Sequence, residues 1–250
     1  MARFENKVMV VTGAASGIGR AIALQALTES AKVIAVDLNA QRLDELKQAA
    51  PQTGELVTVE ANLAADEGIE KVVAAAGDQV DVLVNNAGIM DGFTPVGDVD
   101  DKLWDSVIAV NLTAPMKLMR AFIPKMVAAK SGAVVNVSSL AGTTGGAAGA
   151  AYTASKHGVI GLTRNAAALY AADGLRVNAV CPAGVATNIA EGGAVPAVEW
   201  AWERLQAFMG RPTRMADAQD LASNVLYLAS DEAVNLNGAI LASDGGWTAS

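Results

Sequence analysis

A tyrosine and a lysine in the second half of the chain have the types and spacing of an acid/base pair. Tyr152 and Lys156 are four residues apart, so on a helix their side chains share one face. A phenol ionises near pH 10, and an ammonium group about 4–6 Å away would favour the phenolate and lower its pKa. We therefore expect Lys156 to make Tyr152 a usable proton donor and acceptor. The same spacing also occurs on ordinary helix surfaces, so the pair alone does not establish catalysis.

A glycine-rich turn near the N-terminus could hold phosphate groups. Thr12-Gly13-Ala14-Ala15-Ser16-Gly17-Ile18-Gly19 joins an apolar run to a helical pattern. Glycines at these positions permit a tight turn, close approach of the backbone to a pyrophosphate, and close packing of helix on sheet. The free N–H groups of the helix would attract the phosphates. Such turns also join strands to helices without any ligand.

The carboxylate of Asp37 strengthens the prediction that the glycine turn binds a nucleotide. It follows the second apolar run, at the distance from Gly17 where an acid meets the ribose 2′-hydroxyl of NAD. A carboxylate about 4 Å from the 2′-phosphate of NADP would repel it by roughly 1–4 kcal/mol. Ala14, Ala15 and Leu38 offer no compensating cation, so NAD is favoured over NADP. The alternative role for Asp37 is a cap for the helix that starts near Ala40.

Short apolar runs and helical patterns alternate along the chain and would position these residues. The runs are continuous, as in strands covered on both faces, and lie at 7–11, 32–36, 56–59, 80–84, 133–137, 175–180 and 239–241. Helical patterns lie at 18–30, 40–49, 67–76, 112–129, 152–172 and 216–229. This predicts one α/β domain over residues 1–250, a Rossmann-type doubly wound parallel sheet of about seven strands with helices on both faces.

Composition excludes several classes of partner. The 250 residues are 52% hydrophobic and carry a formal charge of -8, so neither nucleic acid nor anionic membrane is an expected partner. One cysteine and one histidine cannot supply a typical structural zinc set, and we expect no metal site. The chain shows no signal-peptide pattern, and we expect a cytoplasmic protein.

Several ordered motifs together resemble the short-chain dehydrogenase/reductase family from about Lys7 to Trp247. They are the glycine turn, Asn85-Asn86-Ala87-Gly88, Asn111, Ser139, the pair Tyr152 and Lys156, and Ser243-Asp244-Gly245-Gly246. Ser139 is preferred over Ser138 because it lies 13 residues before the tyrosine, as in the family pattern.

The resemblance implies a division of catalytic roles. Hydride would pass between nicotinamide C4 and a carbonyl carbon while Tyr152 exchanges the proton of the oxygen. Ser139 would hold that oxygen, and Lys156 would bind the nicotinamide ribose and depress the tyrosine pKa. Asn111 would hold a water that links Lys156 to solvent.

The resemblance also implies the cofactor contacts. They comprise Gly13, Ser16, Gly17, Ile18, Gly19, Asp37, Asn62, Leu63, Asn86, Ala87, Gly88, Tyr152, Lys156, Pro182, Val185 and Thr187. Two departures stand out: Asn62 replaces the usual Asp near the adenine, and Pro182-Ala183-Gly184 replaces the usual Pro-Gly. The first predicts a weaker adenine contact, and the second an altered local turn.

The leading functional hypothesis is an NAD-dependent dehydrogenase of a neutral, fairly apolar secondary alcohol or ketone. A reductase of β-ketoacyl thioesters is the alternative among enzymes. A nucleotide-sensing regulator without catalysis is the alternative from another class, although Ser139, Tyr152 and Lys156 are all intact.

Two features concern the shape of the molecule. The stretch 188–214 interrupts the strand and helix rhythm and is expected to be a substrate lid, with Trp200, Trp202, Phe208 and Met209 either as its apolar wall or as ordinary helix packing. Small residues in the segments 103–129 and 152–172, where relatives pair, predict a homotetramer completed through 239–250. Alternatively, the small residues only let these helices lie close to the sheet.

Overall fold

One parallel sheet organises the chain, whose computed structural model describes residues 2–185, 196–210 and 214–249. Within these residues seven strands pair in the order β3-β2-β1-β4-β5-β6-β7. They are β1 Val8–Thr12, β2 Lys32–Asp37, β3 Glu55–Glu60, β4 Val82–Asn85, β5 Gly132–Val137, β6 Leu175–Pro182 and β7 Ile240–Ser243. Every pair is parallel, which confirms the predicted doubly wound fold.

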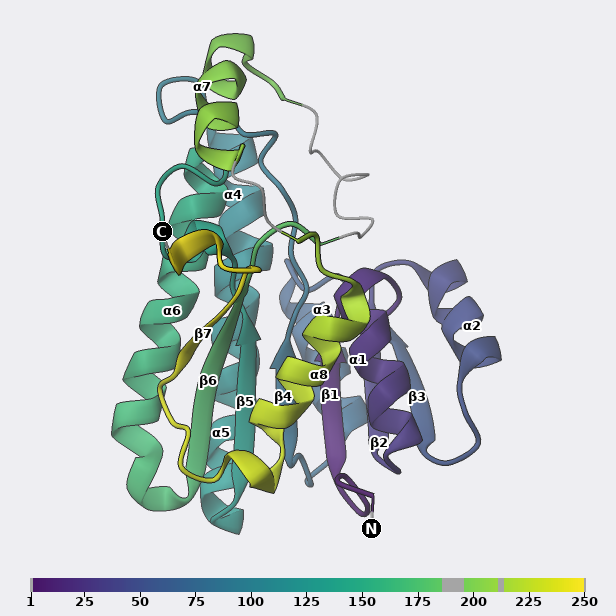
Figure 1. Ribbon diagram of the computed structural model, residues 1–250. Coiled ribbons are helices and arrows are strands. Elements are labelled where there is room, and N and C mark those ends of the chain that lie inside the picture. Colours follow the sequence, from purple (N-terminus) through teal and green to yellow (C-terminus); the bar gives the residue numbers. More distant parts are fainter. Residues whose placement is uncertain (1, 186–195, 211–213, 250) are drawn as a thin grey trace.

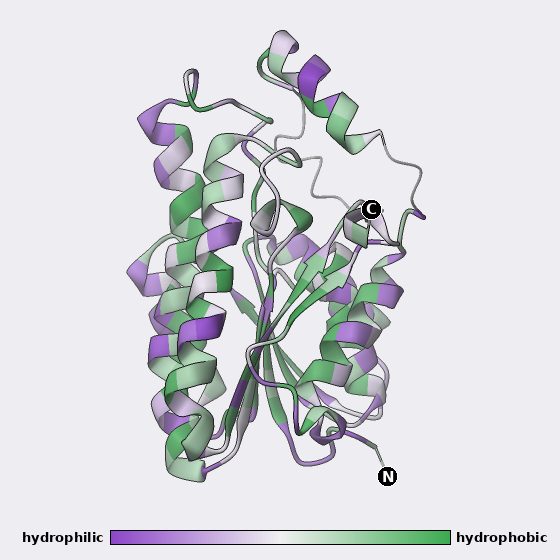
Figure 2. Cartoon of the chain, turned by 60° about the vertical axis from the view of Figure 1, so that its left-hand side comes forward, coloured by the Kyte–Doolittle hydropathy of each residue, from purple (hydrophilic) through white to green (hydrophobic). Residues whose placement is uncertain are grey.

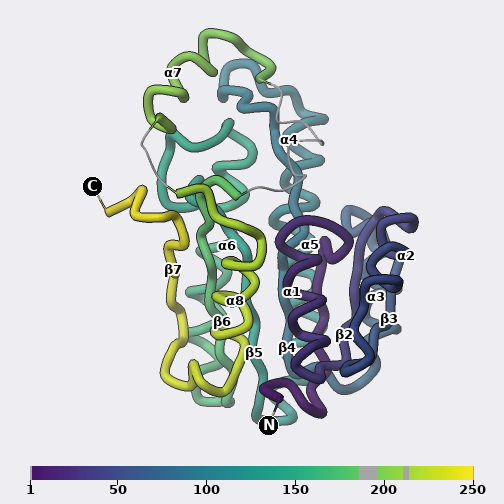
Figure 3. Tube along the Cα trace, turned by 45° about the vertical axis from the view of Figure 1, so that its right-hand side comes forward, coloured from purple at the N-terminus to yellow at the C-terminus, as the bar shows by residue number. Residues whose placement is uncertain are grey.

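Helices cover both faces of this sheet (Figure 1). One face carries α1 Gly17–Thr28, α2 Ala40–Ala49 and α8 Ala218–Ala229. The other carries α3 Asp66–Ala76, α5 Ala114–Ala129 and α6 Ala150–Tyr170. Two more helices, α4 Asp101–Ile108 and α7 Glu199–Met209, lie toward the end of the molecule where the strands finish (Figures 1 and 3).

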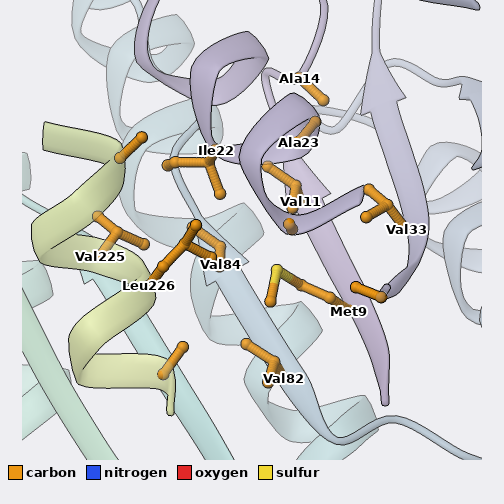
Figure 4. Close-up of a cluster of buried hydrophobic side chains, with 14 of the residues drawn as sticks. Met9, Val11, Ala14, Ile22, Ala23, Val33, Val82, Val84, Val225 and Leu226 are labelled. Carbon is orange, nitrogen blue, oxygen red and sulfur yellow. The ribbon is translucent and has the colours of Figure 1, made fainter. Parts of the chain in front are cut away.

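The continuous apolar runs are explained by burial on both faces. In β1, Met9 and Val11 point into the core under α1 and α8, whereas Val8 and Val10 point into the opposite core. Figure 4 shows the first of these cores, where Ile22 from α1 and Val225 from α8 approach the strands. The helices are mixed in hydropathy, and the strands between them are largely hydrophobic with some hydrophilic positions (Figure 2).

The strand order reverses between β1 and β4, and this position matters for ligands. In open α/β sheets the crevice outside the carboxyl ends of the strands, at such a switch point, is where ligands bind. The glycine turn follows β1 and the Asn85-Asn86-Ala87-Gly88 segment follows β4, so both motifs meet there.

Two helical stretches differ from the helical patterns assigned from the sequence. The first, α4, continues through a π-helical turn at Ala109–Thr113 into α5, so the helical stretch begins well before the 112–129 pattern and near the start of the 103–129 segment expected for pairing. By length and composition Asp101–Ala129 could cross a membrane, but it packs on α3, α6 and the sheet, and core helices pass the same test. The second, α7, forms part of the expected 188–214 lid, of which 188–195 and 211–213 lie outside the described residues.

Candidate active site

The predicted catalytic side chains come from three elements that end on the same side of the sheet. Ser139 follows β5, Tyr152 and Lys156 lie in the first two turns of α6, and Asn111 lies in the π-helical turn. The last three are buried, with exposed fractions of 6%, 3% and 1% respectively. The structure therefore places the four residues near the same end of the sheet, and their catalytic roles stay predictions.

Tyr152 and Lys156 are close, but their pKa values differ from the sequence expectation. The Lys156 Nζ lies 5.5 Å from the centre of the Tyr152 ring. Burial raises the pKa of Tyr152 to about 12, although the neighbouring Ser139 hydroxyl acts in the lowering direction. Burial likewise lowers the pKa of Lys156 to about 8. The predicted depression of the tyrosine pKa is thus wrong for the cofactor-free chain, because desolvation of the buried phenol is the largest influence on it.

Asn111 holds the loop after β4. Its side-chain oxygen accepts a hydrogen bond from the Ile89 N–H at 2.8 Å, and its Nδ2 donates to the Ile89 carbonyl at 2.9 Å and to Ser155 Oγ at 3.3 Å. A π-helical turn displaces the ordinary helical hydrogen bonds and is frequent at functional sites. The water relay implied by the resemblance stays a prediction, since most of the amide is already bonded to protein.

The glycine turn has the backbone that a phosphate site requires. Gly13 and Gly17 have φ values of +63° and +51°, which favour glycine. A Cβ on Gly19 would lie 2.1 Å from the Gly13 carbonyl oxygen, so only glycine lets α1 begin so close to the turn. Ser16 caps α1 without a side-chain hydrogen bond to it. The N–H groups at this helix start are placed to bind an anion, with Ser16 and Ile18 beside them.

Asp37 faces the glycine turn and does not cap α2. Its carboxylate accepts hydrogen bonds from the Ala15 N–H and the Asn39 N–H, both at 3.0 Å. The cap of α2 is Asn39, whose side chain accepts from the Arg42 N–H at 3.0 Å. The capping alternative for Asp37 is therefore wrong, and each of its oxygens keeps a lone pair that could accept from a ribose hydroxyl.

Asn86 links the two strands at the switch point. Its amide donates to the carbonyls of Thr12 and Gly13 at 2.9 and 3.3 Å. The N–H groups of Asn86 and Ala87 donate to Thr12 Oγ1 at 3.0 and 3.1 Å. The motif after β4 thus fixes the shape of the glycine turn.

The remaining predicted contacts lie along the same edge. A Cβ on Gly88 would lie 3.5 Å from Lys156 Nζ, so this glycine leaves room above the lysine. Asn62 forms a local turn through the Ala64 N–H at 3.0 Å, and Leu63 beside it is buried. At the end of β6, Pro182 is followed by Val185, which pairs with Ala216. Thr187 lies outside the described residues.

The aromatic residues of the predicted lid have separate surroundings. The Trp202 ring packs against Phe93 with centroids 4.8 Å apart. Trp200 and Phe208 are exposed, with the Arg204 guanidinium 5.0 Å from the centre of the Trp200 ring. Thus α7 touches the molecule through a few contacts rather than through a continuous apolar face.

Sequence reasoning missed Asp91. Its carboxylate is buried and accepts hydrogen bonds from the backbone at Phe93, Gly149 and Tyr152. An Asp-Gly pair after a strand indicates a turn, but it does not indicate that the carboxylate reaches a helix more than fifty residues ahead.

The residues present fit a nicotinamide dinucleotide cofactor. The glycine turn provides anion-binding N–H groups, Asp37 a ribose acceptor, and Lys156 a buried cation beside Tyr152. Such a cofactor supplies the hydride acceptor or donor for oxidoreduction.

Comparison with known sequences agrees with this chemistry. A family model described as short chain dehydrogenase matches residues 7–194. Short-chain dehydrogenase/reductase olcF of Penicillium canescens is 42% identical, over 99% of each chain. The 3beta-hydroxysteroid dehydrogenase 2 of Eggerthella lenta is 38% identical over 98% of this chain and 95% of its own length.

Solved structures extend the similarity to the whole fold. Levodione reductase superposes with a TM-score of 0.90 at 32% identity, over 99% of this chain and 100% of its own. A putative gluconate 5-dehydrogenase from Beutenbergia cavernae has NADP bound, with a TM-score of 0.84 at 39% identity over 98% of each chain. Carveol dehydrogenase from Mycobacterium avium has NAD bound, with a TM-score of 0.87 at 27% identity over 100% of each chain. With the glycine turn, the buried tyrosine and lysine, and these relatives in agreement, the chain belongs to the short-chain dehydrogenase/reductase family of oxidoreductases.

Proposed function

We propose that this protein is an NAD-dependent dehydrogenase of a neutral, apolar secondary alcohol, or a reductase of the corresponding ketone. The observation that carries the proposal is the convergence of Ser139, Tyr152 and Lys156 at the sheet edge that also holds Asp37 and the glycine turn. A single site can therefore hold a dinucleotide and move a proton beside it.

The chain's own residues divide the work of this reaction. Ser139 would donate a hydrogen bond to the substrate oxygen, and Tyr152 would take its proton during oxidation or return it during reduction. Lys156 would bind the ribose of the nicotinamide half and add a positive charge that favours the phenolate. In the cofactor-free chain its Nζ donates to the Val137 carbonyl at 2.9 Å, which leaves two of the three ammonium N–H donors for the ribose.

The preference for NAD rests on Asp37. A 2′-phosphate placed against its carboxylate would be repelled by roughly 1–4 kcal/mol at about 4 Å. The turn residues Ala14 and Ala15 cannot offset that charge. Relatives bind either cofactor, one with NAD and two with NADP, so the choice must come from this chain's own side chains.

The substrate class rests on the surroundings of Tyr152. The phenol packs in a cluster with Val107, Ala141, Ala148 and Ala151. Its charged neighbours among the described residues are Lys156 and Asp91, both already bonded to backbone. The small apolar side chains of this cluster suit an apolar substrate better than a charged one. The names hydroxysteroid, carveol and levodione among the relatives fit the same class, whereas two other structural relatives are named as gluconate dehydrogenases.

A substrate screen tests the proposal directly. Purified protein is incubated with neutral secondary alcohols and ketones and with NAD or NADP in the matching redox state, and the absorbance of the reduced cofactor is followed. Tyr152→Phe serves as the blank. We expect turnover with at least one apolar substrate and a higher kcat/KM with NAD. Turnover only of thioesters or of charged substrates would contradict the proposal.

A further inference from the structure

Asp91 is a buried carboxylate that joins two distant segments of the chain. It is 1% exposed and lies in the loop after β4. Its Oδ1 accepts hydrogen bonds from the N–H groups of Phe93 at 3.1 Å and Gly149 at 3.2 Å, and its Oδ2 accepts from Tyr152 at 2.9 Å. A buried charge is costly unless it is bonded in this way, so the three donors account for its presence.

The carboxylate supplies the cap that α6 lacks. The residue at the N-cap position is Gly149, which has no side chain to accept the free N–H groups of the first turn. Tyr152 is the third residue of the helix, and its N–H is one that a capping Ser or Asp normally satisfies from within the same segment. Here the acceptor comes from 61 residues earlier, and its charge also suits the positive end of the helix dipole.

The contact between the loop 91–94 and the start of α6 leaves no space for a capping side chain at position 149. A Cβ on Gly149 would lie 2.5 Å from Asp91 Oδ2 and 2.5 Å from the Thr94 nitrogen. The Thr94 carbonyl accepts from the Ala150 N–H at 2.8 Å, so the loop satisfies a second donor of the same turn. The catalytic helix therefore begins directly against the loop 91–94.

The same loop is strained and reaches α7. Gly92 and Phe93 both have positive φ values, +61° and +56°, and for Phe this conformation is uncommon. Such strain persists only where surrounding contacts enforce it, and the bond from the Phe93 N–H to Asp91 is one of them. The Phe93 ring contacts Trp202, and the Gly92 carbonyl accepts from the Ala197 N–H at 2.9 Å.

From this geometry we propose that Asp91 is a positioning residue for catalysis, which fixes Tyr152 through the first turn of α6 and couples it to the loop that contacts α7. The proposal rests on the proposed function of Tyr152 as the proton donor and acceptor. Asp91 is 1% exposed and its oxygens accept from backbone N–H groups, so it acts through the tyrosine.

Asp91 also influences the phenol electrostatically. Its negative charge adds to the burial that raises the pKa of Tyr152. The other groups that face the phenol in the described chain are Ser139 from the loop after β5 and Lys156 from α6 itself, with Cys181 of β6 interacting with the lysine. Removing the carboxylate charge should therefore lower the tyrosine pKa, which the loss of a purely structural cap would not do.

The variant Asp91→Asn tests both effects, since it removes the charge and leaves an NH₂ group that cannot accept one of the N–H donors. Asp217→Asn is the control, because Asp217 caps α8 through a capping box on an exposed helix start. We expect Asp91→Asn to lower kcat by about 10- to 100-fold. The KM for NAD should stay within about twofold, because the glycine turn is separate. The pH midpoint of kcat for alcohol oxidation should move to lower pH. Asp217→Asn should match the wild type in kcat, in the KM for NAD and in the pH midpoint of kcat.

A second readout does not depend on turnover. The absorbance of the phenolate is titrated with pH in the cofactor-free wild type and in Asp91→Asn. The titration of the same protein carrying Tyr152→Phe is subtracted from each, which leaves the signal of Tyr152. The Tyr152 midpoint should lie lower in Asp91→Asn than in the wild type. If it does so while no substrate is turned over, the proposed function fails and the placement of Asp91 stands.

Two results would overturn the proposal: unchanged kcat in Asp91→Asn, or reduced kcat with an unmoved tyrosine midpoint in both titrations. If Asp91→Asn does not fold, Gly149→Ala decides, because its Cβ displaces the carboxylate and keeps the charge. A folded Gly149→Ala with reduced kcat and unchanged NAD affinity supports the proposal, and one with wild-type kcat refutes it.

Discussion

At the scale of single residues, the surroundings of Tyr152 shift its pKa in opposite directions. Burial raises the pKa of its phenol to about 12, which keeps the proton on the oxygen, while Ser139 favours the ionised form. A cation that arrives with the oxidised cofactor would shift this balance further toward the phenolate. In the cofactor-free chain the tyrosine is therefore protonated at neutral pH.

Replacing Tyr152 with Phe should remove turnover and little else. The ring packing is retained and only the phenolic oxygen is lost, so kcat should fall by about 10²–10⁴-fold or more. NAD affinity, measured by fluorescence titration, and the thermal unfolding midpoint should stay close to wild type. Turnover near the wild-type rate would mean that another group exchanges the proton.

Replacing Asp37 with Ser should shift cofactor choice toward NADP. The change removes a negative charge and a ribose acceptor together, so the ratio of kcat/KM for NADP to that for NAD should rise by about tenfold or more. Asp44→Ser on the exposed side of α2 is the control and should leave the ratio unchanged. A wild type that already prefers NADP would show that Asp37 does not decide.

Lys156 should reduce the stability of the fold near neutral pH. Burial lowers its pKa from 10.5 to about 8, so the folded chain binds fewer protons than the unfolded chain between these values. Stability should therefore rise with pH from about 8 to about 10, because the cost of burying the charge is removed.

Lys156→Met tests that cost. Urea unfolding should show that the free energy of unfolding at pH 7 increases by up to about 3 kcal/mol, reduced by the loss of the hydrogen bond to Val137. The free energy of unfolding should also rise less steeply with pH than in the wild type. Lys71→Met on the exposed side of α3 should retain the wild-type slope. A Lys156→Met protein that is less stable than wild type at pH 7 would contradict this account.

At the scale of elements, local patterns predicted most of the framework. The glycine turn and Asp37 could be assigned from spacing because a strand, a turn and a helix adjacent in sequence fix their geometry. The runs near each strand were recognisable because burial on both faces makes them uniformly apolar. Asp91 could not be assigned, because its partners at Gly149 and Tyr152 are set by how α6 docks on the loop.

Helix boundaries were less predictable where tertiary contacts decide them. The π-helical turn at Ala109–Thr113 has no separate sequence pattern, and it carries Asn111, whose side chain bonds Ile89 across the site. The helix α7 has one buried residue, Ala201, so it lacks the apolar stripe that indicates a helix. The pKa of Tyr152 was mispredicted because burial cannot be derived from a four-residue spacing.

The start of α1 should be the most sensitive element boundary near the cofactor site. In Gly19→Ala the new Cβ would collide with the Gly13 carbonyl and with Asn86 Nδ2, at 2.1 and 2.5 Å. The turn must open, so NAD affinity should fall by about tenfold or more and the unfolding midpoint should drop. Gly97→Ala is the control, because no atom of the described chain lies within 4 Å of its Cβ. Unchanged NAD affinity in Gly19→Ala would exclude the turn as the phosphate site.

At the scale of the whole molecule, the outer face of α6 supports self-association. Ala166 and Ala167 are buried in the core, so for these two residues the close-packing alternative holds. Ala154, Gly161 and Ala168 are exposed and recur every seven residues, which forms a stripe of small side chains on one side of the helix. Two copies of α6 could approach closely along this stripe.

We therefore propose a homotetramer in solution, with β7 and α8 forming the second contact. Tyr227 and Leu241 are partly exposed there, at 41% and 37%. Light scattering should give about four times 25.4 kDa at micromolar concentration. Gly161→Arg should reduce the assembly to dimers, whereas a fully active wild-type monomer would refute the proposal.

The strand order also determines when the cofactor site can exist during synthesis. Because β1 lies between β2 and β4, its second edge is open until residue 85 has emerged from the ribosome, about 4–15 s after the end of β1 at usual rates. The side chain that braces the glycine turn, Asn86, arrives with that strand. Tyr152 and Lys156 follow only on α6, after β5 has paired with β4. A nascent chain therefore lacks the complete site for a nicotinamide cofactor until more than half of it is made, and its early strands depend on their own packing.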